Sequence, residues 1–76
     1  MQKAVVMLDG NKEIYFDESV VINHESYMNN CDRDLFDFAY DMMLFEPKPI
    51  IELSNKEGRY AFPSNKILCL KQYKEI

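Results

Sequence analysis

The sequence has no tryptophan and no threonine, and its 76 residues include only two glycines, three prolines, two cysteines and one histidine. Small secreted domains are usually stapled by closely spaced cysteines, so we expect Cys31 and Cys69 to be buried free thiols rather than a disulfide. No apolar run approaches the roughly 20 residues of a transmembrane helix, and the first residues lack the pattern of a secretory signal. These absences predict a cytoplasmic protein with no membrane partner.

Few residues are available for catalysis or metal binding. His24 is the only histidine, and its spacing from Cys31, Cys69 and the four serines does not indicate a nucleophile with its base. The same residues include no short-spaced pair of metal ligands, and no glycine-rich loop is present to bind phosphate. We therefore expect no catalytic residue, no metal and no cofactor, and we expect that the protein is not an enzyme.

The composition is that of a small globular domain. Hydrophobic residues make up 47% and charged residues 29% of the chain, which is far from the composition of a disordered protein. A chain of this length can bury one modest core, so the sequence predicts a single domain over residues 1–76. The scarcity of glycine and alanine, beside abundant lysine, asparagine, isoleucine and tyrosine, favours an AT-rich genome, as in many bacteria, phages and plasmids.

The first part of the chain has the pattern of a β-meander. Residues 3–8 form an apolar run that ends at the turn sequence Asp9-Gly10-Asn11, and residues 12–16 resume with residues that favour strands. Residues 20–22 are β-branched and predict a short third strand. The polar residues 23–30 predict a loop.

Residues 31–45 change to a helical period. Asn30 or Asp32 can cap the helix, and Pro47 ends it. Residues 50–53, 59–62 and 66–71 then predict three further strands. The predicted fold is α+β, with two antiparallel β-meanders flanking one central helix in the order βββ-α-βββ; the third strand of each meander is the less clearly marked.

The two predicted meanders resemble each other weakly. A shift of about 45 residues aligns six positions, from Val5 with Ile50 to Ile22 with Ile67. Similar meanders need similar apolar spacing, so this pattern fits either two independent meanders or a duplication.

The predicted helix is apolar over most of its circumference, with only a narrow polar strip. A single sheet buries only one stripe of a helix, so either both meanders cover this one or part of it meets a partner. We expect Phe38, Leu44 and Phe45 to be exposed, and Met42 to suit an adaptable contact. The polar strip holds Asp34, Asp37 and Asp41, which we call the acidic strip. The predicted partner-binding residues combine both groups: Asp34, Asp37, Phe38, Asp41, Met42, Leu44 and Phe45.

The chain has a formal net charge of −4, and its acidic and basic residues are unevenly distributed. Residues 1–46 hold ten acids and three bases, whereas residues 47–76 hold three acids and six bases. An acidic domain repels phosphate, so nucleic acid is a disfavoured partner. The sequence favours a small acidic protein–protein interaction module, for example a phage or mobile-element inhibitor or regulator of a host or defence protein.

Two alternatives to that hypothesis stay open. One is a homodimeric structural or accessory protein, in which a second copy covers the apolar helix face. The other is a small regulatory domain that binds single-stranded nucleic acid through the basic C-terminal meander. The bases of that meander are Lys48, Lys56, Arg59, Lys66, Lys71 and Lys74.

Overall fold

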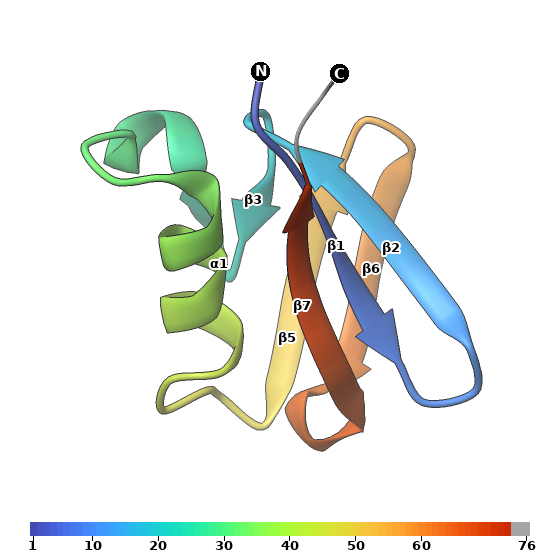
Figure 1. Ribbon diagram of the computed structural model, residues 1–76. Coiled ribbons are helices and arrows are strands. Elements are labelled where there is room, and N and C mark those ends of the chain that lie inside the picture. The colour runs from blue at the N-terminus through green and yellow to red at the C-terminus, as the bar shows by residue number, and fades with distance from the viewer. Residues whose placement is uncertain (74–76) are drawn as a thin grey trace.

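The computed structural model describes residues 1–73 and contains one α-helix and two antiparallel sheets (Figure 1). The strands are β1 (Lys3–Leu8), β2 (Lys12–Asp17), β3 (Val21–Ile22), β4 (Glu25–Ser26), β5 (Ile50–Asn55), β6 (Gly58–Pro63) and β7 (Ile67–Tyr73). The helix α1 spans Leu35–Met43, and two short 3-10 helices span Tyr27–Asn30 and Ser64–Lys66. The predicted α+β fold is confirmed, with strands before and after one helix in the chain and two antiparallel sheets.

The third strand of each meander joins the sheet of the other. One sheet has the order β2-β1-β7 and the other the order β4-β3-β5-β6. In the first sheet, Lys3 to Met7 pair with Tyr73 to Cys69. In the second, Val21 and Ile22 pair with Ser54 and Leu53. This reciprocal exchange locks the two halves of the chain together, because neither sheet is complete without a strand from the other half.

Each half of the chain gives its third strand to the other half, so the two halves of the weak repeat have equivalent places in the fold. Their second strands, β2 and β6, are not equivalent. Tyr15 pairs with Val5 on the outer face of its sheet and is 52% exposed. Tyr60, its counterpart under the shift, packs against the core. Positions of β2 and β6 that the 45-residue shift aligns therefore point to opposite faces of their sheets.

The core lies between the inner faces of the two sheets and the helix. Ala4 and Val6 of β1 and Ile51 and Leu53 of β5 are fully or almost fully buried. Burial alternates along β2 and β5, which is the period-two pattern of strands with one face on a core. The other core residues are Leu8, Ile14, Phe16, Val20, Ile22, Tyr27, Leu35, Phe38, Ala39, Met43 and Phe62.

The loop expected at residues 23–30 contains a short hairpin and a 3-10 turn. Asn23 and His24 both have positive φ, 53° and 69°, and connect β3 to β4. Two consecutive residues with positive φ are typical of a tight two-residue hairpin turn. Ser26 then caps the 3-10 turn by accepting a hydrogen bond from the Met28 amide at 3.2 Å.

The helix is shorter than predicted and begins at a different cap. Asp34, not Asn30 or Asp32, is the N-cap, and its Oδ1 accepts a hydrogen bond from the Asp37 amide at 2.9 Å. The C-terminal end comes at Leu44, before the prolines, because the amides of Leu44 and Phe45 both donate to the Tyr40 carbonyl. The chain then turns away through Glu46, whose φ of 50° is left-handed.

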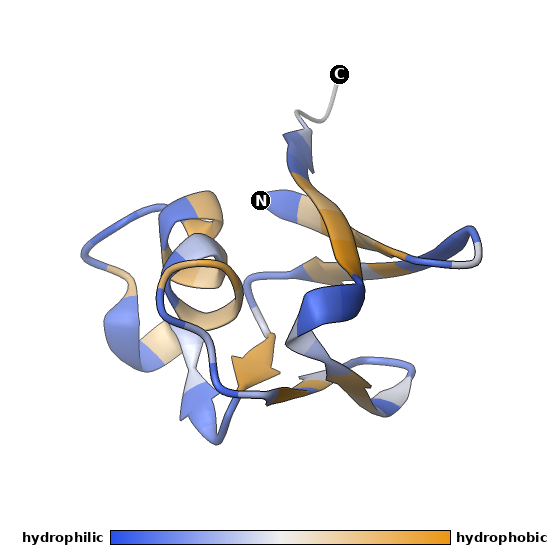
Figure 2. Ribbon diagram, turned by 90° about the horizontal axis from the view of Figure 1, so that it is seen from below, coloured by the Kyte–Doolittle hydropathy of each residue, from blue (hydrophilic) through white to orange (hydrophobic). Residues whose placement is uncertain are grey.

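Two glutamines attach the helix to the first sheet. Gln2 Oε1 accepts a hydrogen bond from the Leu35 amide at 2.8 Å, and Gln72 Oε1 accepts one from the Phe36 amide at 2.9 Å. The first amides of a helix have no partner within the helix, and here side chains beside β1 and on β7 supply it. The helix therefore lies to one side of the two sheets, away from the β1–β2 and β5–β6 hairpins (Figures 1 and 2).

Candidate functional site

The seven predicted partner-binding residues differ in their exposure to solvent. Asp34, Asp37, Asp41, Leu44 and Phe45 are exposed, and Met42 is half-buried. Phe38 is fully buried. The acidic strip and the C-terminal end of the helix are therefore accessible to a partner, whereas Phe38 is not.

The expectation that Phe38 is exposed is wrong. Its ring makes an edge-on contact with Tyr27 at a centroid separation of 5.5 Å, and the Arg33 guanidinium lies 5.7 Å from the ring centroid. The 3-10 turn of residues 27–30 places Tyr27 there, and Tyr27 donates a 2.7 Å hydrogen bond to the Arg33 carbonyl. This turn covers the side of the helix that a single sheet leaves open.

Three aromatic rings form a stack along the exposed side of the helix. Phe36 and Tyr40 are stacked at 6.4 Å between ring centroids, and Tyr40 and Phe45 are stacked at 6.4 Å. Residues four apart lie one above the other on a helix, which explains the first pair. The second arises because the Phe45 amide bonds back to the Tyr40 carbonyl and folds the chain over that ring.

Leu44 completes an apolar surface with these rings. Tyr40 is 42%, Leu44 39% and Phe45 56% exposed, whereas Phe36 is half-buried. We call these four residues the helix-end patch. The predicted partner-binding residues do not include Phe36 and Tyr40, although a spacing of four residues places both on one face of a helix.

The acidic strip runs beside this patch, and its three carboxylates differ in their contacts. Asp34 is engaged as the helix cap, and Asp41 forms an ion pair with Arg33. The hydrogen bond and negative charge of Asp34 raise the pKa of Asp37 above its ordinary value. A cation from a partner placed beside Asp37 would oppose this effect and bind its carboxylate.

The basic residues of the C-terminal part are distributed over strands of both sheets and over the segments between strands. Lys56 pairs with Asp17 at 3.0 Å and Lys66 with Asp9 at 3.8 Å. Lys71 is on β7 in the first sheet, whereas Arg59 is on β6 in the second. Lys74 lies outside the described residues. The meander that would bind single-stranded nucleic acid is therefore split between two sheets, and part of its charge is neutralised by acids.

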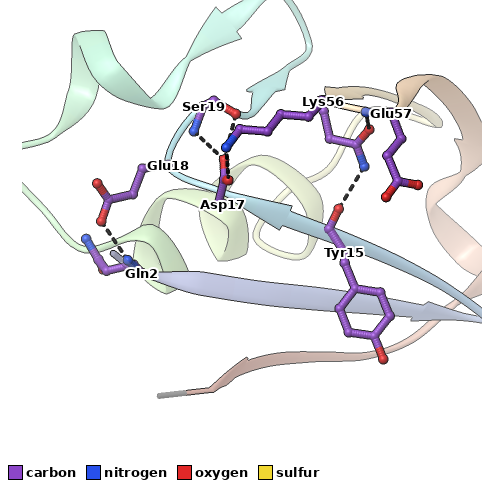
Figure 3. A network of polar contacts seen from close by, with 8 residues as sticks. Gln2, Tyr15, Asp17, Glu18, Ser19, Lys56 and Glu57 are labelled. Atoms are coloured by element: carbon purple, nitrogen blue, oxygen red, sulfur yellow. Dashed lines mark hydrogen bonds and ion pairs between the residues drawn. The ribbon is translucent and has the colours of Figure 1, made fainter. Parts of the chain in front are cut away.

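Asp17 links the end of β2 to the turn between β5 and β6 (Figure 3). Its Oδ1 accepts hydrogen bonds from the Ser19 hydroxyl at 2.6 Å and the Ser19 amide at 2.9 Å. These bonds, with the charge of Lys56, lower the pKa of Asp17 from 3.8 to about 2. Close by, Asn55 Nδ2 donates a 2.7 Å hydrogen bond to the Tyr15 carbonyl, so two contacts join the sheets here.

Replacing Asp17 by asparagine is expected to lower the free energy of unfolding by about 1–2 kcal/mol at pH 7, less than the full pKa shift implies because the carboxylate still meets solvent. The folded-state pKa is depressed, so this stabilisation is present above pH 3.8 and is lost as pH falls through about 2. Urea unfolding of both proteins between pH 7 and pH 2 measures the difference. Asp9→Asn is the control, since its exposed ion pair should contribute under about 0.5 kcal/mol; a wild-type advantage over Asp17→Asn that persists to pH 2 would contradict the expectation.

The remaining candidate residues do not converge on a second site. His24 is exposed, and its Nε2 lies 3.0 Å from Glu52 Oε2. Cys31 and Cys69 are free, as expected, but both are exposed, so the prediction that they are buried is wrong. In residues 1–73, no cluster of three or more histidine, cysteine, aspartate or glutamate side chains is placed to hold a metal ion.

The helices of the protein and its similarity to known proteins were compared with known classes. Over the described part of the chain, no helix combines the length and apolar character needed to cross a membrane. No protein-family model, curated protein sequence or solved structure matches the chain.

Proposed function

We propose that the protein is a small protein–protein interaction module that binds a basic partner protein through the helix-end patch. The observation that carries the proposal is the exposed aromatic stack of Tyr40 and Phe45, with Leu44, beside acidic residues. Aromatic side chains that are exposed together are enriched at protein interfaces, where they act as anchors. A patch on the end of a rigid, capped helix also loses little conformational entropy when it binds.

Charge favours a basic partner. The chain has a formal net charge of −4, and Asp37 and Asp41 lie on the helix that carries the patch. Opposite charges around an apolar contact speed association and set orientation. The same charges oppose pairing of two copies through this patch, because the acidic strips would face each other.

The proposed biological setting depends on composition. We expect the protein to act in the cytoplasm of a bacterium, where a phage or other mobile element would use it to inhibit or regulate a host or defence protein. Its small size and acidic surface suit a protein that occupies the basic site of another. A homodimer is the alternative that the same experiment tests.

The test begins with the double variant Leu44→Asp with Phe45→Asp, which places charge on the patch without touching the core. Leu68→Asp is the matched control, because Leu68 is also an exposed apolar residue, 68% accessible, on β7. Proteins captured from a bacterial lysate by the wild type are identified and purified, and their affinity is measured at low and moderate salt. We expect the double variant to lose at least tenfold in affinity, the control to lose less than twofold, and higher salt to weaken wild-type binding.

Two outcomes would overturn this proposal. One is a purified partner that binds the double variant as tightly as the wild type. The other is a wild-type dimer, detected by sedimentation over a concentration series, that the double variant converts to a folded monomer. The second result would assign the patch to self-association instead.

A further inference from the structure

On the side of the molecule away from the helix, the border between the two sheets runs between β2 and the β5–β6 hairpin (Figures 1 and 2). At one end this border is closed by the hydrogen bond from Asn55 to the Tyr15 carbonyl and by the Lys56–Asp17 ion pair. Elsewhere along it lies an open groove of about 610 Å³. Its lining residues are Leu8, Lys12, Glu13, Ile14, Arg59, Tyr60, Ala61 and Phe62.

The floor of this groove is apolar. Leu8, Ile14 and Phe62 belong to the core but retain 6–7% exposure, and Tyr60 is partly buried against them. On the opposite side of the molecule α1 packs against β7 and β1. No helix or strand within residues 1–73 covers the groove in the same way.

One rim of the groove is the unpaired edge of β6. Among the strands of residues 1–73, β6 is the last of its sheet and pairs with β5 alone. The Ser64 amide donates to the Pro49 carbonyl at 2.9 Å, so even-numbered residues of β6 direct their backbone groups toward β5. The amide and carbonyl groups of Arg59 and Ala61 therefore point away from the sheet and toward the groove.

The other rim, β2, offers fewer free groups. The Asp9 amide donates to the Lys66 carbonyl, so odd-numbered residues of β1 face β7 and even-numbered ones face β2. Glu13 and Tyr15 of β2 then direct their backbone groups outward, consistent with the bond from Asn55 to the Tyr15 carbonyl. Because that carbonyl is already engaged, β6 is the richer edge for a new strand.

We propose that this groove binds an extended segment of a partner protein, which adds to the edge of β6 as a further antiparallel or parallel strand. An extended chain can bond to the outward-facing backbone groups of Arg59 and Ala61 at the same time and replace the water bound there. Alternate side chains of that chain would point onto the apolar floor. Arg59–Phe62 accommodates about four extended residues, roughly 13 Å.

The charges around the groove and its apolar floor indicate the composition of the bound segment. Lys12 and Arg59 exceed the single acid Glu13 around the groove, so we infer a segment in which acidic residues alternate with apolar ones. A second copy of this chain fits less well, because the inward side chains of its strands are already buried in its own core. It could pair with the edge but would leave the apolar floor open. This proposal does not depend on the helix-end patch.

Ala61 provides a clean test of strand addition. Its amide points away from β5, so Ala61→Pro removes an edge donor without breaking the sheet, and Pro63 already occupies an equivalent edge-facing position. Ala61→Ser is the matched control, since it keeps the amide. The probe is a displayed library of random nonapeptides selected on the 76-residue chain, from which individual synthetic peptides are measured.

We expect selected peptides with alternating apolar and acidic residues, which bind Ala61→Ser within twofold of wild type and Ala61→Pro at least tenfold more weakly. The helix-end double variant should bind them unchanged. A second measurement needs no protein variant: N-methylation of alternate peptide amides should abolish binding in only one of the two registers. Failure to select any peptide, equal binding to Ala61→Pro when that variant is folded, or indifference to N-methylation in both registers would overturn the proposal.

Discussion

Replacing Phe38 by alanine is expected to lower the free energy of unfolding by about 3–5 kcal/mol, which is the usual cost of removing a buried aromatic ring. Phe38 is fully buried and contacts Tyr27 edge-on, so the substitution leaves a cavity and removes a ring–ring contact. A domain of this size has a total stability of only about 4–11 kcal/mol. Urea unfolding followed by circular dichroism should therefore show a large loss of stability.

Phe45→Ala is the control for this prediction, because Phe45 is 56% exposed and lies on the same segment. We expect it to cost under about 1 kcal/mol. Equal losses for the two variants would mean that Phe45 is as important to the fold as Phe38. The patch proposed for partner binding would then be part of the core.

Removing both glutamine side chains at the start of the helix, in the double variant Gln2→Ala with Gln72→Ala, is expected to cost about 2–4 kcal/mol. Gln2 and Gln72 accept hydrogen bonds from the Leu35 and Phe36 amides, and Gln2 Nε2 also donates to the Tyr27 hydroxyl at 3.0 Å. These partly buried groups would lose their partners. Urea unfolding measures the total, and hydrogen exchange of the two amides locates it.

Gln72→Glu separates loss of the acceptor from loss of the side chain. Glutamate keeps an oxygen for the Phe36 amide and places a negative charge at the N-terminus of the helix, where it is favourable. We expect stability within about 1 kcal/mol of wild type. If the Leu35 and Phe36 amides of the double alanine variant exchange at the wild-type rate, the hydrogen bonds from these amides to Gln2 and Gln72 do not hold the helix to the sheet.

The candidate site was predictable only where local spacing decides the outcome. Leu44 and Phe45 follow the last helical turn, and their exposure agrees with the expectation of surplus apolar residues. The identity of the cap was not predictable, because Asn30, Asp32 and Asp34 can each cap a helix. Asp34 is selected because the preceding residues form the 3-10 turn that covers Phe38.

The sequence by itself determined the local elements: the β1–β2 and β5–β6 hairpins, one helix between them, and an acidic helix face. Turn residues and apolar periodicity specify such elements because they involve neighbours in the chain. Only the tertiary structure decided that β3 and β7 exchange sheets and that α1 covers the side opposite the β2–β6 groove. Those choices depend on how the whole core is buried, since each third strand has the same local pattern whichever first strand it joins.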